Sequence, residues 1–239
     1  MSFARLSFAA LLSVSIFTAS AHAEKPVNPF DGKSLDGWMT VKGDPAPAGW
    51  EVVDGVIHLK PGKQGGGNIV TRHQYGDFSL SFEWKVAAKG NSGIKYRVRD
   101  YKGKTLGIEY QIYDDNATAK PGPARGSAGS IYDLYEPNAA KMLKPVGEYN
   151  TARIVVRNNH IQHWLNGKLI ANAYVGGAEW NKRIAESKFN DIPGFGENEV
   201  GRLMLTDHGT EVWIRNARFQ TYHNDGGESR PRRFRFFRR

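Results

Sequence analysis

Apolar and polar residues alternate along much of the chain, in short runs separated by turn residues. The clearest run covers residues 78–86 (FSLSFEWKV), where every even position is aromatic or aliphatic and every odd position is polar. Residues 94–99 and 108–113 repeat the pattern, with Ile94, Tyr96 and Val98 opposite Lys95 and Arg97 in the first. A period of two is typical of a strand with one buried face, so we expect β-strands over all three runs.

Turn signals extend this pattern to most of the chain. Asp54-Gly55 predicts a hairpin over residues 50–59, and Asn166-Gly167 predicts one between 161–165 and 168–173. Residues 152–157, 202–206 and 212–219 are further expected strands, whereas only residues 178–189 have helical spacing. Many short strands with scarce helix signals predict an all-β antiparallel sandwich or barrel.

The two ends of the chain differ from its centre. Arg5, a run of apolar and small residues and the Ala21-His22-Ala23 tripeptide are typical of a signal peptide, too short to span a membrane. We therefore expect cleavage near Ala23, a periplasmic or secreted protein without a membrane span, and a single β-sandwich domain over residues 24–223. Residues 224–239 form a basic tail rich in Arg and Phe, which we interpret as disordered; contact with an anionic surface is the alternative.

Composition removes several function classes. The 239 residues include no cysteine, which excludes disulfides, thiolate metal sites and cysteine nucleophiles. The formal net charge is +9, but the tail and the signal hold about half of it, so basicity does not indicate nucleic-acid binding. The sequence indicates neither a partner protein nor an oligomeric state.

Polar side chains on the predicted strands indicate a sugar-binding surface. Glu83, Arg97, Glu109 and Gln111 are expected opposite the core-facing residues of three consecutive strands. Glu, Gln and Arg hydrogen-bond sugar hydroxyls, and aromatic residues can stack on sugar rings. The aromatic candidates and the nearby histidine are Tyr113, Tyr132, Trp213 and His208. A solvated exterior face is the alternative interpretation.

Other catalytic and metal signatures are missing. The chain has no G-x-S-x-G, P-loop or H-E-x-x-H motif. Asp114-Asp115-Asn116 offers oxygen atoms that suit Ca²⁺, although the same residues are typical of a turn.

An ordered set of sequence motifs runs along the chain. The motifs are FDGKSLDGW at 30–38, WEVVDG at 50–55, YGDF at 75–78 with FEW at 82–84, GNSGI at 90–94, EYQI at 109–112 with Asp114, GSIY at 129–132, KPVGEYN at 144–150, WLNG at 164–167, and DHG at 207–209 with Arg215-Asn216. Together these motifs resemble the family of secreted 3-keto-disaccharide hydrolases. They span nearly the whole expected mature chain. The tail lies outside the pattern, and Tyr149 stands where the family usually has Trp.

The resemblance implies a concanavalin-like jelly roll, similar to laminin-G domains, that cleaves glycosides oxidised at C3. The ketone acidifies the C2 proton, a base removes it, the C1 oxygen leaves by β-elimination, and water adds afterwards. On this basis Glu109 or His208 is the candidate base, with Arg97 near the developing oxyanion. The candidate sugar-binding or supporting residues are Glu83, Gln111, Asp114, Tyr132, Asn91 and Ser92.

Two other functions stay open at this point. An ordinary glycoside hydrolase could use Glu83 and Glu109 as its carboxylate pair. A carbohydrate-binding module without catalysis could use the same fold. No cofactor is required by the pattern; a divalent cation held by Asp114, Glu109 and His208 is an option without a recognisable ligand spacing.

Overall fold

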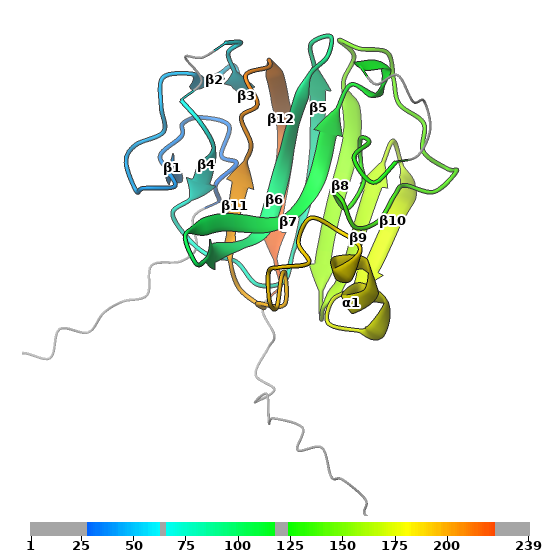
Figure 1. Cartoon of the computed structure of the whole chain (residues 1–239). Helices are drawn as coiled ribbons and strands as arrows, with labels where there is room; N and C mark the ends of the chain where they lie inside the picture. The colour runs from blue at the N-terminus through cyan, green and yellow to red at the C-terminus, as the bar shows by residue number, and fades with distance from the viewer. Residues whose placement is uncertain (1–27, 63–65, 118–123, 223–239) are drawn as a thin grey trace, which may run out of the picture.

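Two antiparallel β-sheets make up the computed structural model, which describes residues 28–62, 66–117 and 124–222 (Figure 1). The expected signal peptide and the basic tail lie outside these residues. The five-stranded sheet has the order β1 (Trp38–Thr40), β4 (Ile69–Thr71), β11 (Arg202–Leu205), β6 (Asn91–Tyr101), β7 (Lys104–Tyr113). The seven-stranded sheet has the order β10 (Lys168–Tyr174), β9 (His160–Leu165), β8 (Asn150–Arg157), β5 (Phe78–Val86), β12 (Val212–Thr221), β3 (Val56–Leu59), β2 (Trp50–Val53).

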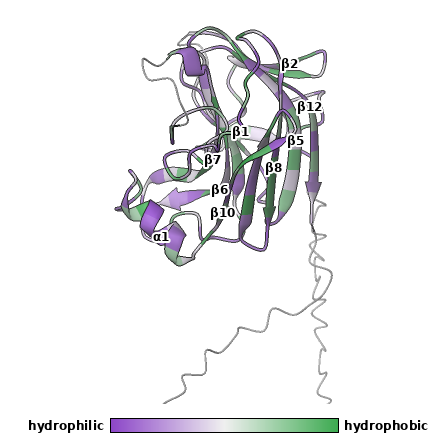
Figure 2. Cartoon of the chain, turned by 90° about the vertical axis from the view of Figure 1, so that its right-hand side faces the viewer, coloured by the Kyte–Doolittle hydropathy of each residue, from purple (hydrophilic) through white to green (hydrophobic). Residues whose placement is uncertain are grey.

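The apolar face of each sheet packs against the other and forms the core. Phe82 on β5 meets Tyr110 on β7 edge to face, and Phe78 meets Tyr96 on β6 in the same way. His163 is buried in this core with satisfied ring nitrogens: Tyr96 lies 2.9 Å from Nε2 and the Gly129 carbonyl 3.0 Å from Nδ1. Figure 2 shows the resulting interleaving of hydrophobic and hydrophilic residues along the strands. The fold is the concanavalin-like antiparallel sandwich, or jelly roll.

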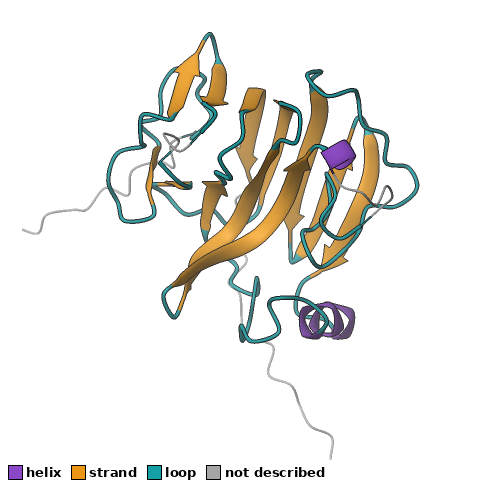
Figure 3. Cartoon of the chain, turned by 45° about the horizontal axis from the view of Figure 1, so that its top comes forward, coloured by secondary structure: helices purple, strands orange, loops and turns teal. Residues whose placement is uncertain are grey.

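Most predicted elements are confirmed. The run over 78–86 is β5 with the expected bounds, and both predicted hairpins form, as β2–β3 and β9–β10. The helix is shorter than its pattern, since α1 covers Ala178–Ala185, and a 3₁₀ turn covers Asp115–Ala117. Figure 3 shows α1 at one end of the sandwich. The three-residue strands β1 and β4 were not predicted, because such short segments show no alternation.

The predicted alternation in β6 is wrong beyond Tyr96. A β-bulge lies between Tyr96 and Arg99, and Arg97 has a φ of +52°, in the left-handed region. The extra residue reverses the faces, so Val98 packs with Val70 and Met204 in a small cluster apart from the main core. Arg97 is consequently buried, at 2% exposure, instead of lying on the polar face with Lys95.

The three strands expected to share one polar face belong to two sheets. β6 and β7 are neighbours in the five-stranded sheet, but β5 lies in the seven-stranded sheet, between β8 and β12. Glu83 on β5 is therefore separated from Glu109 and Gln111 on β7 by the core of the sandwich. Among the described residues, none of the helical structure has the length and apolar character that crossing a membrane requires.

Candidate active site

A lysine–glutamate pair occupies the outer face of the five-stranded sheet. Lys95 on β6 is the register partner of Glu109 on β7, and both point away from the core side chains Ile94 and Tyr110. The Lys95 Nζ lies 3.6 Å from Oε2 of Glu109, and the side chains are 18% and 7% exposed. Strand alternation thus brings a cation and a carboxylate together at a sheltered position.

A glycine makes room for the Glu109 carboxyl. A Cβ on Gly93 would lie 2.2 Å from Oε1 of Glu109, so position 93, two residues before Lys95 on β6, must lack a side chain. The Oγ1 of Thr206, just after β11, lies 3.4 Å from the same Oε1. Burial raises the pKa of Glu109, and the charges of Lys95 and Lys188 oppose that rise. The carboxyl is held in place, with its negative charge balanced by lysine.

The loop that carries His208 is tied to β6 by side-chain hydrogen bonds. Ser92 Oγ donates to the Thr206 carbonyl at 2.8 Å, and Thr210 Oγ1 donates to the Asn91 carbonyl at 2.8 Å. Asp207 accepts from the Gly209 amide at 2.7 Å, which closes a tight turn around His208. The imidazole is therefore presented by a fixed loop at the end of β11, beside the Lys95–Glu109 pair.

His208 is exposed at the rim of this face, yet its surroundings disfavour a positive charge. Partial desolvation and the positive charges of Lys95 and Lys188 lower its pKa, and Asp207 acts in the opposite sense. The neutral ring, which can accept a proton, is therefore favoured at neutral pH. Desolvation and the neighbouring ammonium groups together favour the form of the ring that can act as a base.

A second loop closes the rim with an aromatic ring and a lysine. The Tyr132 amide donates to the carbonyl of Glu109 at 3.0 Å, which fixes this loop against β7. Lys188 Nζ lies 4.1 Å from the centre of the Tyr132 ring, and the Lys188 amide donates to Asp133 at 2.7 Å. An exposed ammonium group thus stands beside an aromatic ring at the edge of the Lys95–Glu109 surface.

The structure brings together six of the predicted site residues, in two kinds of place. Glu109, His208 and Tyr132 surround the open face. The other three support it: Gln111 donates from Nε2 to Oδ1 of Asn91 at 3.0 Å, and Asn91 and Ser92 anchor the His208 loop.

Glu83 and Arg97 lie elsewhere. Glu83 accepts from Nε of Arg215 at 2.8 Å on the outer face of the seven-stranded sheet, and this bond lowers its pKa. Stacked sheets lie about 10 Å apart, and Glu83 and Glu109 point outward from opposite sheets, so their carboxyls are farther apart than the roughly 9.5 Å limit for a glycosidase pair. Arg97 Nη1 donates to the Gly196 carbonyl at 3.1 Å, and its side chain lines a cavity that none of Lys95, Glu109 and His208 lines.

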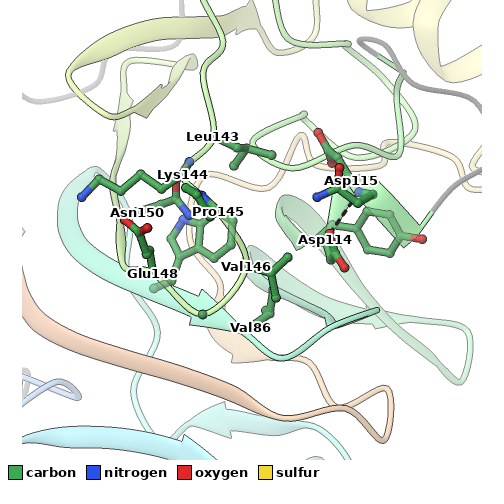
Figure 4. Close-up of a pocket in the computed structure, with 13 residues that line it drawn as sticks. Val86, Asp114, Asp115, Leu143, Lys144, Pro145, Val146, Glu148 and Asn150 are labelled. Carbon is green, nitrogen blue, oxygen red and sulfur yellow. Dashed lines mark hydrogen bonds between the residues drawn. The ribbon is translucent and has the colours of Figure 1, made fainter.

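The carboxylate of Asp114 is engaged in hydrogen bonds with the backbone. Its carboxylate accepts from the Lys89 amide at 2.8 Å and the Asn116 amide at 3.0 Å, the latter drawn as a dashed line in Figure 4. It lines a cavity of about 410 Å³ that has Trp84, Val86 and Leu143 among its apolar walls. The carboxylate of Asp114 thus stabilises the turn after β7, and Lys95, Glu109 and His208 do not line this cavity.

The donor set does not fit the cation considered from the sequence. Among the residues that the structure describes, no three His, Cys, Asp or Glu side chains are grouped to hold a metal ion. Asp115 has its own partners, the Ala128 amide and Lys141.

Sequence reasoning missed both lysines of the site. Lys95 had a usable signal, because it lies on the polar side of its strand and is paired with the polar side of the next one. Lys188 had none, since the helical spacing of residues 178–189 predicts it on a helix, whereas α1 ends at Ala185 and Lys188 lies in the loop that follows.

Comparison with known proteins identifies the family. The model of the 3-keto-alpha-glucoside-1,2-lyase-like domain matches residues 25–220. The chain belongs to this family. A 3-keto-disaccharide hydrolase of Bacteroides thetaiotaomicron is 30% identical in an alignment 220 residues long, and the match covers 79% of this chain and 76% of that protein.

Two solved structures that match most of this chain have the same fold. A candidate glycosyl hydrolase of Parabacteroides distasonis has a TM-score of 0.71 and 31% identity, and the match covers 82% of this chain and 93% of that chain. Another candidate glycosyl hydrolase of the same organism has a TM-score of 0.63 and 25% identity, over 82% of this chain and 98% of that one. The chain is thus a carbohydrate-active protein of the 3-keto-disaccharide hydrolase type.

Proposed function

We propose that the face around Lys95, Glu109 and His208 binds a glycoside oxidised at C3 and cleaves it by proton abstraction and β-elimination. The observation that carries the proposal is the arrangement of His208 beside Lys95 and Lys188. Partial desolvation, followed by these positive charges, lowers the pKa of His208, and the same charges attract negative charge on a substrate. Membership of the family supports the class of substrate.

The reaction needs a base and a stabilised oxyanion. His208 removes the proton from C2, and the electrons of that bond move toward the C3 carbonyl to give an enolate. When the enolate collapses, a double bond forms between C1 and C2, and the bond from C1 to the leaving oxygen breaks. The leaving oxygen takes up a proton, and water then adds at C1 and C2 to complete a net hydrolysis.

Each remaining residue has a role in this scheme. The Lys95 and Lys188 ammonium groups stabilise the enolate oxygen by charge, a contribution that is largest in a partly desolvated site. Glu109 positions Lys95, because its buried carboxylate lies 3.6 Å from the lysine nitrogen. The Tyr132 ring offers an aromatic surface for the sugar.

Export is part of the same proposal. We assign residues 1–23 as a signal that is removed near Ala23, so that the enzyme acts in the periplasm or outside the cell. The N-terminal sequence of the protein recovered from the cell envelope or the medium tests this directly; a start at Met1 contradicts it.

The decisive experiment compares a 3-keto-disaccharide with its unoxidised parent. We expect cleavage of the keto sugar alone, exchange of the C2 proton with deuterated solvent, and loss of both activities in His208→Ala. His160→Ala, on the outer face of the other sheet, is the matched control and should keep them. Cleavage of the parent at a similar rate, or binding without turnover of either sugar, contradicts the proposal.

A further inference from the structure

A second polar cavity lies at the other end of β6 from Gly93. It has a volume of about 290 Å³ and is bordered by the residue before β5, the turn between β8 and β9, the end of β12 and the segment before β11. These strand ends meet at the lower end of the sandwich in Figure 1. Its polar and aromatic lining includes Asp77, Arg97, Asn158, Asn159, Glu199 and Tyr222.

The buried guanidinium in this cavity has unused donors. Arg97 is 2% exposed, and of its five N–H donors only those on Nη1 find a partner, the Gly196 carbonyl at 3.1 Å. Its Nε has no hydrogen-bond partner, and none of the ion pairs between described residues includes Arg97. Buried polar groups are nearly always paired, so an unpaired guanidinium beside a cavity calls for an explanation.

The backbone holds Arg97 in this unusual position. Its φ of +52° is unfavourable for a residue with a side chain, and the bulge turns the side chain away from the outer face of the sheet. Asn198 Nδ2 donates to the Arg97 carbonyl at 3.0 Å, and a Cβ on Gly201 would lie 2.5 Å from the carbonyl carbon of Arg97. The segment that supplies Glu199 therefore also fixes the bulge. Such strain is commonly kept where the conformation serves a function.

The two aspartates of the larger cavity are already paired. There, Asp114 accepts two backbone amides and Asp115 is paired with Lys141 and the Ala128 amide. In the Arg97 cavity, one oxygen of Asp77 accepts from the Asn158 amide at 2.9 Å, whereas no described group hydrogen-bonds the side chains of Glu199 or Asn159. Free donors and free acceptors thus line one cavity, in which Arg97 is buried and Glu199 lies at the exposed rim.

The residues that line the Arg97 cavity indicate which kind of ligand it can bind. Hydroxyl groups both donate and accept, so a neutral polyhydroxylated ring can satisfy the Asp77 and Glu199 carboxylates together with the Arg97 guanidinium. An anion is opposed by the two carboxylates, and a cation by the guanidinium. The Tyr222 ring adds an aromatic wall, and the volume lies at the small end of the range for ligand pockets. We propose that this cavity is a second, non-catalytic site that binds one neutral sugar ring.

The test uses the full chain labelled with ¹⁵N and titrated with methyl α-D-glucopyranoside. We expect saturable shifts of the Gly76 and Asn159 amide signals, with a dissociation constant in the millimolar range that is usual for one small ring. Glu199→Gln and Asn159→Ala should each weaken binding by about tenfold. Glu197→Gln removes an acid from the same segment that does not line the cavity, and it should change nothing.

The readout separates this site from the proposed active site. Sugar bound at the catalytic face shifts the Gly209 amide, and Glu199→Gln leaves that shift unchanged. Absence of saturable shifts at Gly76 and Asn159 overturns the proposal. Tighter binding of glucuronate than of the neutral glycoside, with Glu199→Gln strengthening it, also overturns it, since the cavity would then be an anion site.

Discussion

The Nζ of Lys95 lies 3.6 Å from Oε2 of Glu109 across neighbouring antiparallel strands, on the outer face of the smaller sheet. This relationship organises the candidate active site. It places a charged ammonium group next to the loop of His208. It also gives the buried Glu109 carboxylate a counter-charge. Removing either partner therefore changes the charge that the substrate meets.

Adding one methyl group beside Glu109 should disable the site. The Cβ of Gly93→Ala would overlap Oε1 of Glu109, at 2.2 Å, so the carboxylate must move and Lys95 loses its anchor. We expect a loss of kcat/KM of roughly 10²-fold, the scale associated with a misplacement of about 1 Å. Overpacking should also lower the free energy of unfolding by about 1–3 kcal/mol. Steady-state kinetics and urea denaturation measure the two effects.

The matched control for that change is Gly177→Ala. A Cβ there meets nothing closer than 3.9 Å, and the position precedes α1, outside the strands that carry Lys95 and Glu109. If Gly93→Ala is as active as Gly177→Ala, the location of Glu109 does not matter for turnover, and its positioning role is wrong.

Each site lysine should contribute to the rate, not mainly to binding. Lys95→Met and Lys188→Met remove charges that stabilise an enolate, so we expect kcat to fall by roughly 10²–10³-fold for Lys95, the scale for one oxyanion-stabilising donor. Lys188 is more exposed, and its loss should be smaller. Lys85→Met, on the outer face of the other sheet and 4.3 Å from the Trp213 ring, serves as the control. A rise in KM with unchanged kcat contradicts electrostatic stabilisation of the transition state.

The pH profile of kcat/KM should report His208. A base must be neutral, so activity should rise with pH through a pKa below the usual 6.5 of histidine. Because the Lys95 charge contributes to that lowering, Lys95→Met should raise the pKa of His208 and move the rising limb to higher pH. The measurement follows kcat/KM from acid to neutral pH for both proteins. A limb that stays in place in Lys95→Met, as it should in Lys85→Met, argues against His208 as the base.

Local patterns predicted the strands because alternation and turn residues act over a few positions. The strand over residues 78–86 and both hairpins could be predicted from the residues within those segments. The assignment of strands to sheets did need it: β5 precedes β6 along the chain, yet the two belong to different sheets. Glu83 therefore matched the polar pattern of Glu109 while lying across the core from it.

Some features of the candidate site could not be predicted, because no local sequence pattern indicates them. The bulge that buries Arg97 is set by the close approach of Gly201 and the hydrogen bond from Asn198, about a hundred positions along the chain. Lys188 reaches the face only because its loop is bonded to Asp133 in another loop. In contrast, Glu109 and His208 could be proposed from sequence, since a family motif surrounds each of them.

Core residue His163 should make the stability of the protein depend on pH. Burial lowers the pKa of His163 to about 4, while in the unfolded chain the value is close to the ordinary 6.5. Below pH 6.5 the unfolded state binds a proton that the folded state does not, so the free energy of unfolding should fall as the pH drops from about 6.5 to about 4, and this contribution should level off below that. The full difference corresponds to about 3 kcal/mol, at 1.36 kcal/mol for each pKa unit. Urea denaturation at a series of pH values measures it.

His163→Phe should be less stable at neutral pH, because Tyr96 and the Gly129 carbonyl lose their partner, but its stability should fall less steeply over this range. His160→Gln, near the surface on the same strand, should keep the steep fall, and an equally steep fall in His163→Phe would show that another group is responsible.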